Sequence, residues 1–463
     1  MSNISRIHQS FLSQTSSPSA EARKSIDALK TWNPHFNALV RSNFEWATSH
    51  ALHQTESLSP AYIQSKPLLG IPCTIKECFA WKGMPHSSGL KSSHDVVAHY
   101  NAPTVQRLLD AGALPIGSTN LSELCMWMES YNTVYGRTNN PYDLHRTVGG
   151  SSGGEGAMVG SGCVPFGLGS DIGGSIRMPA FFCGVFGHKP TPGLVPNSGQ
   201  YPNAEGEAQD YLCTGPLTQS AHDLMPILKV LSDRDDLVDP SSVDLSSLVV
   251  YSMIGDGRRS LSKELRKSQA MVAQTLSDHG LTVIEHTIPE FKYSVEIWSA
   301  ALEAAGGVPF RELLFEDPSH SVLFEILRFI FGTSQHTFPA LGLVLIEDFG
   351  KRFDTLKPFV EQGIALRKQF HDLLGKNSVF LYPSHAQVAP KHRKALLPPW
   401  NWAYTAILNI MKVPVTQVPL GLNRSGIPLG VQVAAGPHQD HLSIALAIAL
   451  EREFGGWVEP PKP

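Results

Sequence analysis

The stretch Gly149–Pro192, GGSSGGEGAMVGSGCVPFGLGSDIGGSIRMPAFFCGVFGHKPTP, holds the pattern from which the rest of the chain can be interpreted. Two serines flanked by glycines, Ser151 and Ser175, lie 24 residues apart in it. Each is followed by a run compatible with a helix, and Val164–Leu168 between them predicts a buried strand. Glycines beside a serine let the backbone approach a substrate closely and aim several N–H groups at one point. The stretch is therefore typical of a nucleophile with an oxyanion hole.

A serine becomes nucleophilic only when a base takes its proton, and an upstream lysine is the candidate base. Lys76 ends the apolar, β-like run Leu68–Ile75. A lysine that leaves a buried strand can lose its charge through desolvation and act as a neutral base at about pH 7. On its own such a lysine is far more often a solvated surface charge, so its assignment depends on the wider pattern.

Lys76, Ser151 and Ser175 together resemble the pattern of the amidase signature family, whose members use a Ser–cis-Ser–Lys triad. Further segments resemble fatty-acid amide hydrolases, especially the second vertebrate type, and the likeness runs from about Pro67 to Pro460. These segments are GSDIGGSIRMPAFF, LCMWMES, NNPYDL, CTGP, FLYPSH, APKH, PVTQVPLGL and FGGWVEP. The resemblance implies that Ser175 is the nucleophile, that Ser151 follows a cis peptide bond and relays protons, and that Lys76 is the base.

The resemblance also implies which groups surround the nucleophile. The expected oxyanion hole consists of the backbone N–H groups of four consecutive residues: Ile172, Gly173, Gly174 and Ser175. Ser152 and Ser170 are expected to be supporting hydrogen-bond partners. Asp171 and Arg177 flank the nucleophile, and we expect them to pair, because arginine rarely tolerates burial without a partner.

Apolar residues in two of the quoted segments are the candidates for substrate binding. The expected acyl pocket includes Cys125, Met126, Trp127, Phe181 and Phe182, although such residues are more often ordinary core. Asn120 is expected to cap a helix over LSELCMWM. Val322–Phe349 is open to two interpretations, buried core helices or a cap that lines an acyl channel or touches a bilayer surface.

Nineteen histidines make a Ser-His-Asp triad an alternative to be weighed. No GxSxG elbow surrounds Ser175, so the α/β-hydrolase pattern is absent. His188, His385 and His392 are expected to be structural or at most to line the pocket. The glycine-rich GGSSGGEG lacks the terminal Gly-Lys-Ser/Thr of a phosphate-binding loop. No metal-ligand cluster stands out in the sequence, and we expect neither a metal nor a cofactor.

Composition and charge indicate which kinds of partner and which cellular location to expect. The net charge of −4 gives no basic footprint for nucleic acid. The six cysteines include no CxxC pair, which favours buried, reduced thiols and a cytoplasmic location. Residues 1–20 lack the apolar core of a signal peptide, and no uncharged run of about 18 apolar residues predicts a transmembrane helix. Any membrane contact would have to be peripheral, and the sequence leaves a homodimer open.

The order of short β-like and helical runs indicates the fold class. Their alternation from Leu68 to about Lys189 predicts an α/β fold with a large, mixed, largely parallel central sheet and helices on both faces. The resemblance implies that this is the amidase-signature fold, with one domain over residues 1–463. Within it we expect a catalytic core segment over 60–235, a variable substrate-shaping insertion over 236–370, and a C-terminal segment over 371–463 that completes the sheet.

These observations predict an amidohydrolase that works through an acyl-enzyme. The resemblance points to fatty acid amides or N-acylethanolamines, cleaved to the free acid and the amine or ammonia. Vertebrate members of the family carry an N-terminal membrane anchor, which we do not expect in this sequence, and this leaves small or aryl amides and esters as an alternative. Two further alternatives are the amidase subunit of a glutamine-dependent amidotransferase and a non-catalytic scaffold that keeps the fold. Glu155 and the IRMPAFF segment look like the fatty-acid amide hydrolase branch.

Overall fold

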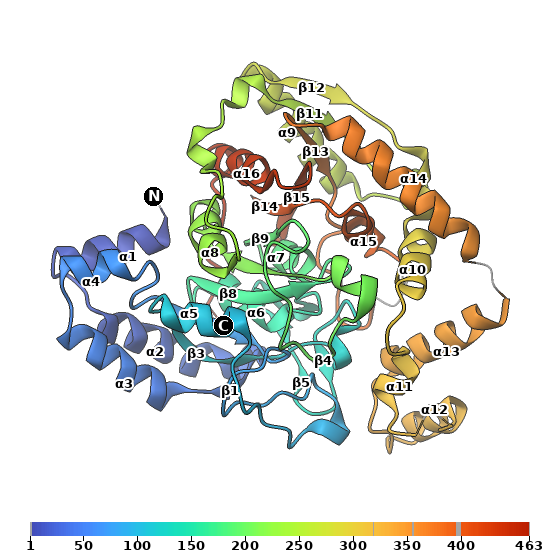
Figure 1. Cartoon of the computed structure of the whole chain (residues 1–463), viewed down its shortest axis with the longest axis horizontal. Coiled ribbons are helices and arrows are strands. Elements are labelled where there is room, and N and C mark those ends of the chain that lie inside the picture. The colour runs from blue at the N-terminus through green and yellow to red at the C-terminus, as the bar shows by residue number, and fades with distance from the viewer. Residues whose placement is uncertain (1, 318, 354–355, 395–399, 463) are drawn as a thin grey trace.

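An eleven-stranded sheet forms the centre of the molecule (Figure 1). The computed structural model describes residues 2–317, 319–353, 356–394 and 400–462. In spatial order the strands of the sheet are β1 (Leu39–Ser42), β3 (Leu114–Thr119), β2 (Pro72–Lys76), β8 (Phe166–Asp171), β10 (Cys213–Thr218), β9 (Phe186–Lys189), β14 (Val415–Leu422), β15 (Pro428–Ala435), β13 (Ser378–Tyr382), β11 (Val249–Ser252) and β12 (Thr282–Glu285).

The pairing within this sheet is mixed. Parallel pairing joins β2 to β3 and to β8, and joins β11 to β12 and to β13. The other six neighbouring pairs are antiparallel. The prediction of a large mixed sheet is confirmed, with less parallel pairing than the alternation of runs had indicated. The physical reason is twofold: β14 and β15 form a hairpin, whose strands must be antiparallel, and β10 inserts between β8 and β9 and runs opposite to both.

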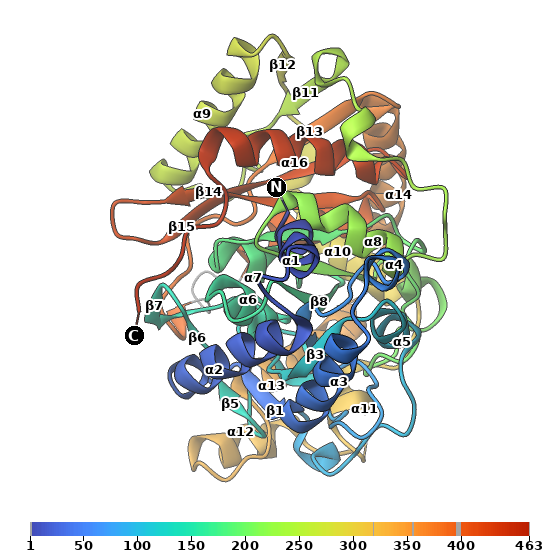
Figure 2. The same cartoon turned by 90° about the vertical axis from the view of Figure 1, so that its left-hand side faces the viewer.

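Helices cover both faces of the sheet, as predicted. The helices that cover the sheet include α5 (Pro103–Asp110), α6 (Gly153–Gly160), α7 (Arg177–Phe182), α8 (Leu224–Leu231) and α16 (Asp440–Phe454). Cys73 and Ile75 of β2 belong to a buried cluster that includes residues of α5, α8 and α16. Thr74 and Lys76 point to the opposite face, where both side chains meet residues at or within α6. Figure 2 shows α16 lying along β14 and β15, which it contacts.

Four helices from the first part of the chain and two small sheets lie outside the central sheet. The helices are α1 (Asn3–Leu12), α2 (Pro18–Phe36), α3 (Phe44–Glu56) and α4 (Pro60–Ser65). One small sheet pairs β4 (Tyr131–Asn132) with β5 (Gly136–Arg137), and the other pairs β6 (Asn139–Asn140) with β7 (Asp143–Thr147).

The segment that follows Asn120 is not the helix that the sequence predicted. Only Glu123–Cys125 forms a single 3₁₀ turn, and inside it Leu124 and Cys125 have φ angles of 53° and 60°. A residue in this left-handed region cannot continue a right-handed helix, so the chain turns away after one turn.

The expected insertion, 236–370, supplies β11 and β12 at one edge of the sheet as well as most of the remaining helices. These are α9 (Lys263–Asp278), α10 (Ser294–Ala304), α11 (Phe310–Leu314), α12 (Val322–Ile330), α13 (Phe338–Phe353) and α14 (Lys357–Leu374). Figure 1 shows α11, α12 and α13 grouped together at the side of the molecule, away from the sheet. The segment 371–463 supplies β13, β14, β15, α15 (Ala403–Ile410) and α16. Within the described ranges, no helix has the length and apolarity needed to cross a membrane.

Candidate active site

Lys76 and Ser151 meet in the buried layer between the sheet and α6. The Nζ atom of Lys76, the last residue of β2, donates to Oγ of Ser151 at 2.6 Å and to Oγ of Ser170 at 2.9 Å. All three side chains are buried. The peptide bond between Gly150 and Ser151 is cis. The structure thus brings together the expected base, the expected relay serine and one of the two expected supporting serines.

The other supporting serine, Ser152, lies beside them. Its hydroxyl donates to the carbonyl of Ser170 at 3.2 Å, and its backbone N–H donates to the carbonyl of Ser175 at 3.1 Å. Ser152 therefore connects the segment that carries Ser151 with β8 and with the nucleophile loop.

Ser175 lies in the turn between β8 and α7, at the wall of a cavity. The turn is closed by Asp171, whose Oδ1 accepts the N–H of Gly174 at 2.7 Å and whose Oδ2 accepts the N–H of Ile176 at 3.1 Å. This differs from the expectation for the oxyanion hole, since the N–H of Gly174 is engaged by a carboxylate. Ile172, Gly173 and Ser175 all line the cavity.

Asp171 and Arg177 form the expected ion pair, which is wholly buried. The guanidinium of Arg177 contacts both carboxylate oxygens of Asp171 at 3.0 Å. It also donates to the carbonyl of Thr405 at 3.0 Å, to Oδ1 of Asn409 at 2.5 Å and to Oε1 of Gln432 at 2.9 Å. Burial opposes the charge of Asp171, but Arg177 outweighs it and holds the pKa of this carboxyl below its usual range.

Glu155 is a buried carboxyl in the same layer; in the sequence it served only as a mark of one branch of the family, with no chemical role assigned to it. Its Oε2 accepts from Oγ1 of Thr74 at 2.5 Å, and its Oε1 accepts from Oγ1 of Thr119 at 2.6 Å. Burial raises the pKa of Glu155 to about 8, although the two hydroxyls and the charge of Lys76 act against that rise. Because Thr74 lies two residues before Lys76 on β2, alternation along the strand places Glu155 on the same face as the lysine.

The cavity at Ser175 has a volume of about 500 Å³ and a largely apolar wall. Three of the five expected pocket residues line it, Cys125, Met126 and Trp127. Phe181 and Phe182 do not, because α7 turns them into a buried cluster behind the wall. Further lining residues come from α13, α10 and the segment before α15, and they are Phe338, Pro339, Gly342, Leu343, Ile346, Trp298, Trp400 and Trp402.

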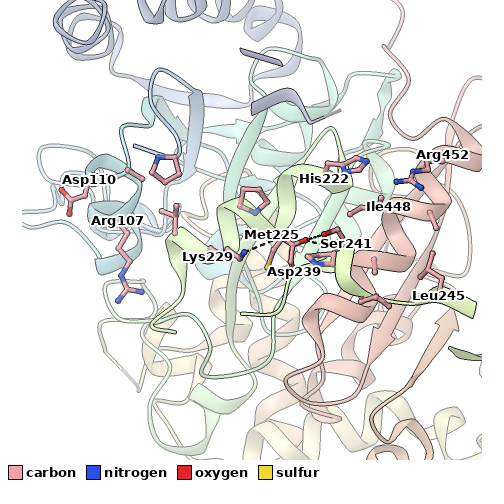
Figure 3. Close-up of a pocket in the computed structure, with 18 residues that line it drawn as sticks. Arg107, Asp110, His222, Met225, Lys229, Asp239, Ser241, Leu245, Ile448 and Arg452 are labelled. Atoms are coloured by element: carbon pink, nitrogen blue, oxygen red, sulfur yellow. Dashed lines mark hydrogen bonds and ion pairs between the residues drawn. The ribbon is translucent and has the colours of Figure 1, made fainter. Parts of the chain in front are cut away.

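A larger cavity, of about 950 Å³, lies on the α5, α8 and α16 side of the molecule (Figure 3). Its wall carries basic and acidic side chains, including Lys229 and Asp239, which form an ion pair at 3.7 Å. Its lining includes none of the three expected catalytic residues. The smaller cavity is therefore the one in which a substrate would reach Ser175.

The histidines considered for a different triad have structural partners. His188 is buried between Oδ1 of Asp440 and Oγ1 of Thr416, and burial lowers the pKa of His385 to about 4. His392 contacts the carbonyl of Leu144 through Nε2. None of them lines the cavity at Ser175. Over the residues that have been placed, no group of His, Cys, Asp and Glu is arranged to hold a metal ion.

Comparison with known proteins adds independent information. A family model described as Amidase matches residues 21–444. Fatty-acid amide hydrolase 2 of Homo sapiens is 45% identical over 460 residues, which is 94% of this chain and 86% of that protein. A glutamyl-tRNA(Gln) amidotransferase subunit of Methanosarcina barkeri is 28% identical over 410 residues, covering 83% and 85% of the two chains. A solved structure named fatty acid amide hydrolase has a TM-score of 0.79 at 20% identity, with 99% of this chain and 85% of that chain covered.

Proposed function

The chain belongs to the amidase family and is an amide hydrolase, and from this premise we propose that it cleaves fatty-acid amides or N-acylethanolamines. The products would be the free acid and the amine or ammonia. The single observation that carries the proposal is the largely apolar cavity of about 500 Å³ whose wall includes Ser175. A volume of this size is typical of pockets that enclose a small ligand, and an apolar wall favours an acyl chain.

The proposed reaction begins with attack of Ser175 on the amide carbonyl. Lys76 is the base that takes the proton of Ser175 through Ser151, and its 2.6 Å hydrogen bond to Ser151 supports this route. The N–H groups of Ile172, Gly173 and Ser175 receive the tetrahedral oxyanion. One such donor typically contributes about 3 kcal/mol to transition-state stabilisation.

The second half of the proposed reaction returns the proton and frees the acid. Ser151 protonates the leaving nitrogen, which completes cleavage of the C–N bond and leaves an acyl group on Ser175. Water then attacks this ester by the same relay, which releases the acid and restores the hydroxyl of Ser175. Neither half of the proposed reaction uses a cofactor.

A lipid-like substrate is supported by an exposed apolar surface next to the cavity. On α12, Leu323, Leu327 and Ile330 are exposed, although their side chains are fully apolar. On α13, Phe338 and Ile346 are exposed and also line the cavity. Contiguous exposed apolar residues commonly mark an interaction site. We propose that this surface makes a peripheral membrane contact from which acyl chains enter the cavity.

The three alternative functions, an amidotransferase subunit, an amidase of small or aryl amides and a non-catalytic scaffold, each predict a different activity. An amidotransferase subunit would act on glutamine and would need partner subunits. An amidase of small or aryl amides would gain nothing from a longer acyl chain. A scaffold would not react with a fluorophosphonate at Ser175. The 45% identity to a fatty-acid amide hydrolase, against 28% to an amidotransferase subunit, supports the proposed lipid amidase. A cytoplasmic location and a homodimer stay predictions from the sequence.

The decisive experiment is hydrolysis of an N-acylethanolamine series from acetyl to oleoyl by the wild type and by Ser175→Ala. We expect kcat/KM to rise with chain length, because each buried methylene contributes about 0.8 kcal/mol to the free energy of binding. We expect activity to vanish in Ser175→Ala, because the variant lacks the nucleophile. Activity confined to acetyl or aryl amides would overturn the lipid proposal. Undiminished activity in Ser175→Ala would overturn the mechanism.

A further inference from the structure

All five backbone carbonyls from Asp171 to Ser175 accept a hydrogen bond, so the orientation of each peptide in the nucleophile loop is fixed. In the order of the carbonyls, the donors are Nδ2 of Asn409, Nε1 of Trp298, Oγ1 of Thr405, N–H of Met178 and N–H of Ser152. These peptides are trans, and the C=O and the N–H of a trans peptide point in opposite directions. A donor that holds one carbonyl therefore also sets the direction of the next N–H group.

Three N–H groups of this loop are available to a substrate. They belong to Ile172, Gly173 and Ser175, which all line the cavity. Among the residues that the structure describes, none accepts a hydrogen bond from these three groups, whereas the N–H of Gly174 is taken by Asp171. The direction of the three available groups decides whether they can bind an oxyanion together.

Trp298 holds the peptide between Ile172 and Gly173. Its Nε1 donates to the carbonyl of Ile172 at 3.0 Å, although the two residues are 126 positions apart in the sequence. Its ring contacts that of Trp402 edge to face, with centroids 4.8 Å apart. It also packs on Gly173, where an added Cβ atom would lie 3.4 Å from three indole atoms. An indole has one N–H donor, so the whole donor capacity of Trp298 serves this carbonyl.

The peptide that Trp298 holds would otherwise be free to rotate. Gly173 tolerates a wide range of φ, because it has no Cβ atom, and so resists rotation of the preceding peptide only weakly. A half-turn would exchange the carbonyl of Ile172 with the N–H of Gly173. A carbonyl oxygen at that position would repel an oxyanion, whereas the N–H would stabilise it. The hydrogen bond from Trp298 therefore protects the arrangement that suits acyl transfer.

We propose that Trp298 is a positioning residue of the oxyanion hole, whose indole N–H holds the carbonyl of Ile172 and thereby aims the N–H of Gly173 at the substrate carbonyl. The inference rests on the proposed function, in which this loop receives the oxyanion. Thr405 does not have the same role, because the N–H of the peptide that it holds belongs to Gly174 and is already engaged by a carboxylate. Since Trp298 lies on α10, the segment expected to shape the substrate site also contributes to the chemical step.

The test removes the indole N–H and keeps an aromatic ring. Trp298→Phe is the variant, and Trp457→Phe is its matched control. Trp457 is also partly buried, and its Nε1 also donates to a backbone carbonyl, that of Gly160 at 2.8 Å, but it does not line the cavity. Both variants should lose a similar amount of stability, so a difference in activity reports where the hydrogen bond lies rather than its loss alone.

The kinetic readout is the division of the effect between kcat and KM. We expect Trp298→Phe to lower kcat at least tenfold with KM within twofold of the wild type, because the aim of the donor matters only when the oxyanion forms. Trp457→Phe should leave both constants within twofold. The substrates are oleoylethanolamide and p-nitrophenyl butyrate, an activated ester that needs the oxyanion hole but no long acyl pocket.

An alkyl trifluoromethyl ketone measures binding of the oxyanion itself. Oγ of Ser175 bonds to the ketone carbon, the π pair of the C=O bond moves to the oxygen, and the proton of Ser175 passes to Lys76 through Ser151. We expect Trp298→Phe to weaken this inhibitor by the same factor as it lowers kcat/KM, and to bind the matching secondary alcohol, which forms no oxyanion, within twofold of the wild type. Equal losses for the ketone and the alcohol, or a loss of kcat below threefold, would overturn the inference.

Failure of this inference and failure of the proposed function give different results. A wild type that hydrolyses only the ester would refute the proposed lipid substrate, and the ester and the ketone would then decide the role of Trp298. A wild type that the ketone does not inhibit and whose Ser175 a fluorophosphonate does not label would overturn both. If Trp298→Phe does not fold, 3-benzothienylalanine at position 298, which matches tryptophan in size but has no N–H, should show the same losses.

Discussion

Gly167→Ala is a substitution whose effect depends on the buried carboxyl of Glu155. Gly167 lies on β8, and a Cβ atom there would overlap Oε2 of Glu155 and approach its Cδ to 2.9 Å. Glu155 cannot move aside freely, because Thr74 and Thr119 hold its two oxygens. The chain has two ways to relieve the overlap. The strand can shift, which costs about 1–3 kcal/mol for overpacking, or Glu155 can leave its hydroxyl partners, at about 1–3 kcal/mol for each buried hydrogen bond.

The cheaper route, a shift of the strand, sets the cost, so we expect Gly167→Ala to lower the free energy of unfolding by about 1–3 kcal/mol. Urea unfolding followed by tryptophan fluorescence measures this loss. The decisive comparison repeats the substitution in a Glu155→Ala background, where no carboxyl remains to collide with. There the further cost should fall below about 1 kcal/mol, since the two residues are in contact and their effects should not add.

Gly342→Ala is the control, because a Cβ atom at Gly342 meets nothing within 4 Å. This variant should be as stable as the wild type or slightly more stable, as expected for alanine in a helix. If Gly167→Ala lowers the free energy of unfolding by the same amount in the wild type and in the Glu155→Ala background, within about 0.5 kcal/mol, the steric reasoning is refuted.

Three further predictions concern the relay, the pH dependence and the membrane surface. Ser151→Ala should lower kcat at least 100-fold, which is the order of magnitude expected for the loss of a proton-transfer group. Ser152→Ala should lower kcat far less. Equal losses of kcat for the two variants in a steady-state assay would contradict the relay. Burial raises the pKa of Glu155 from 4.5 to about 8, so the folded state keeps a proton that the unfolded chain releases. The free energy of unfolding should therefore fall between these pH values by about 1 kcal/mol per unit, and urea unfolding of Glu155→Gln should show that this part of the slope is lost. Leu327→Glu should weaken sedimentation with phosphatidylcholine vesicles at least tenfold, whereas Leu52→Glu, whose leucine is equally exposed at 54% on α3, should leave it unchanged.

The sequence predicted the residues that meet at the site better than it predicted the sheet around them. Lys76 and Ser151 could be paired in advance because, together with Ser175, they resemble the pattern of the amidase signature family, whereas the local pattern around Lys76 alone would have favoured a surface charge. The antiparallel centre of the sheet could not be predicted from the sequence. It depends on β10 lying between β8 and β9, and this order is determined by packing between strands that are distant in the sequence. The predicted helix after Asn120 was wrong for a similar reason. Its apolar spacing is helical, but tertiary contacts hold Leu124 and Cys125 in the left-handed region.

Within the cavity, the sequence identified the wall only in part. Trp127 could be found because it belongs to a recognisable segment. Phe181 and Phe182 belong to another such segment, but α7 turns both inward, and no local pattern tells which side of a wholly buried helix faces a cavity. Trp298 could not be placed at all from sequence, since it reaches the site from α10 and its Nε1 donates to the carbonyl of Ile172 at 3.0 Å. Such positions are fixed by long-range packing rather than by periodicity.

The buried Arg177 behind the nucleophile loop cannot bind all of its partners until most of the chain has been synthesised. Arg177 reaches its last partner at Gln432, which follows Ser175 in the chain by 257 residues. A ribosome adds about 5–20 residues per second, so roughly 13–50 s pass between the two. Throughout that interval the nascent loop lacks at least one of the groups that hold Arg177 in place, since Thr405 and Asn409 also follow Ser175 by more than 200 residues. A polypeptide that ends before Gln432 would therefore contain Lys76, Ser151 and Ser175 and still lack a partner of the buried arginine.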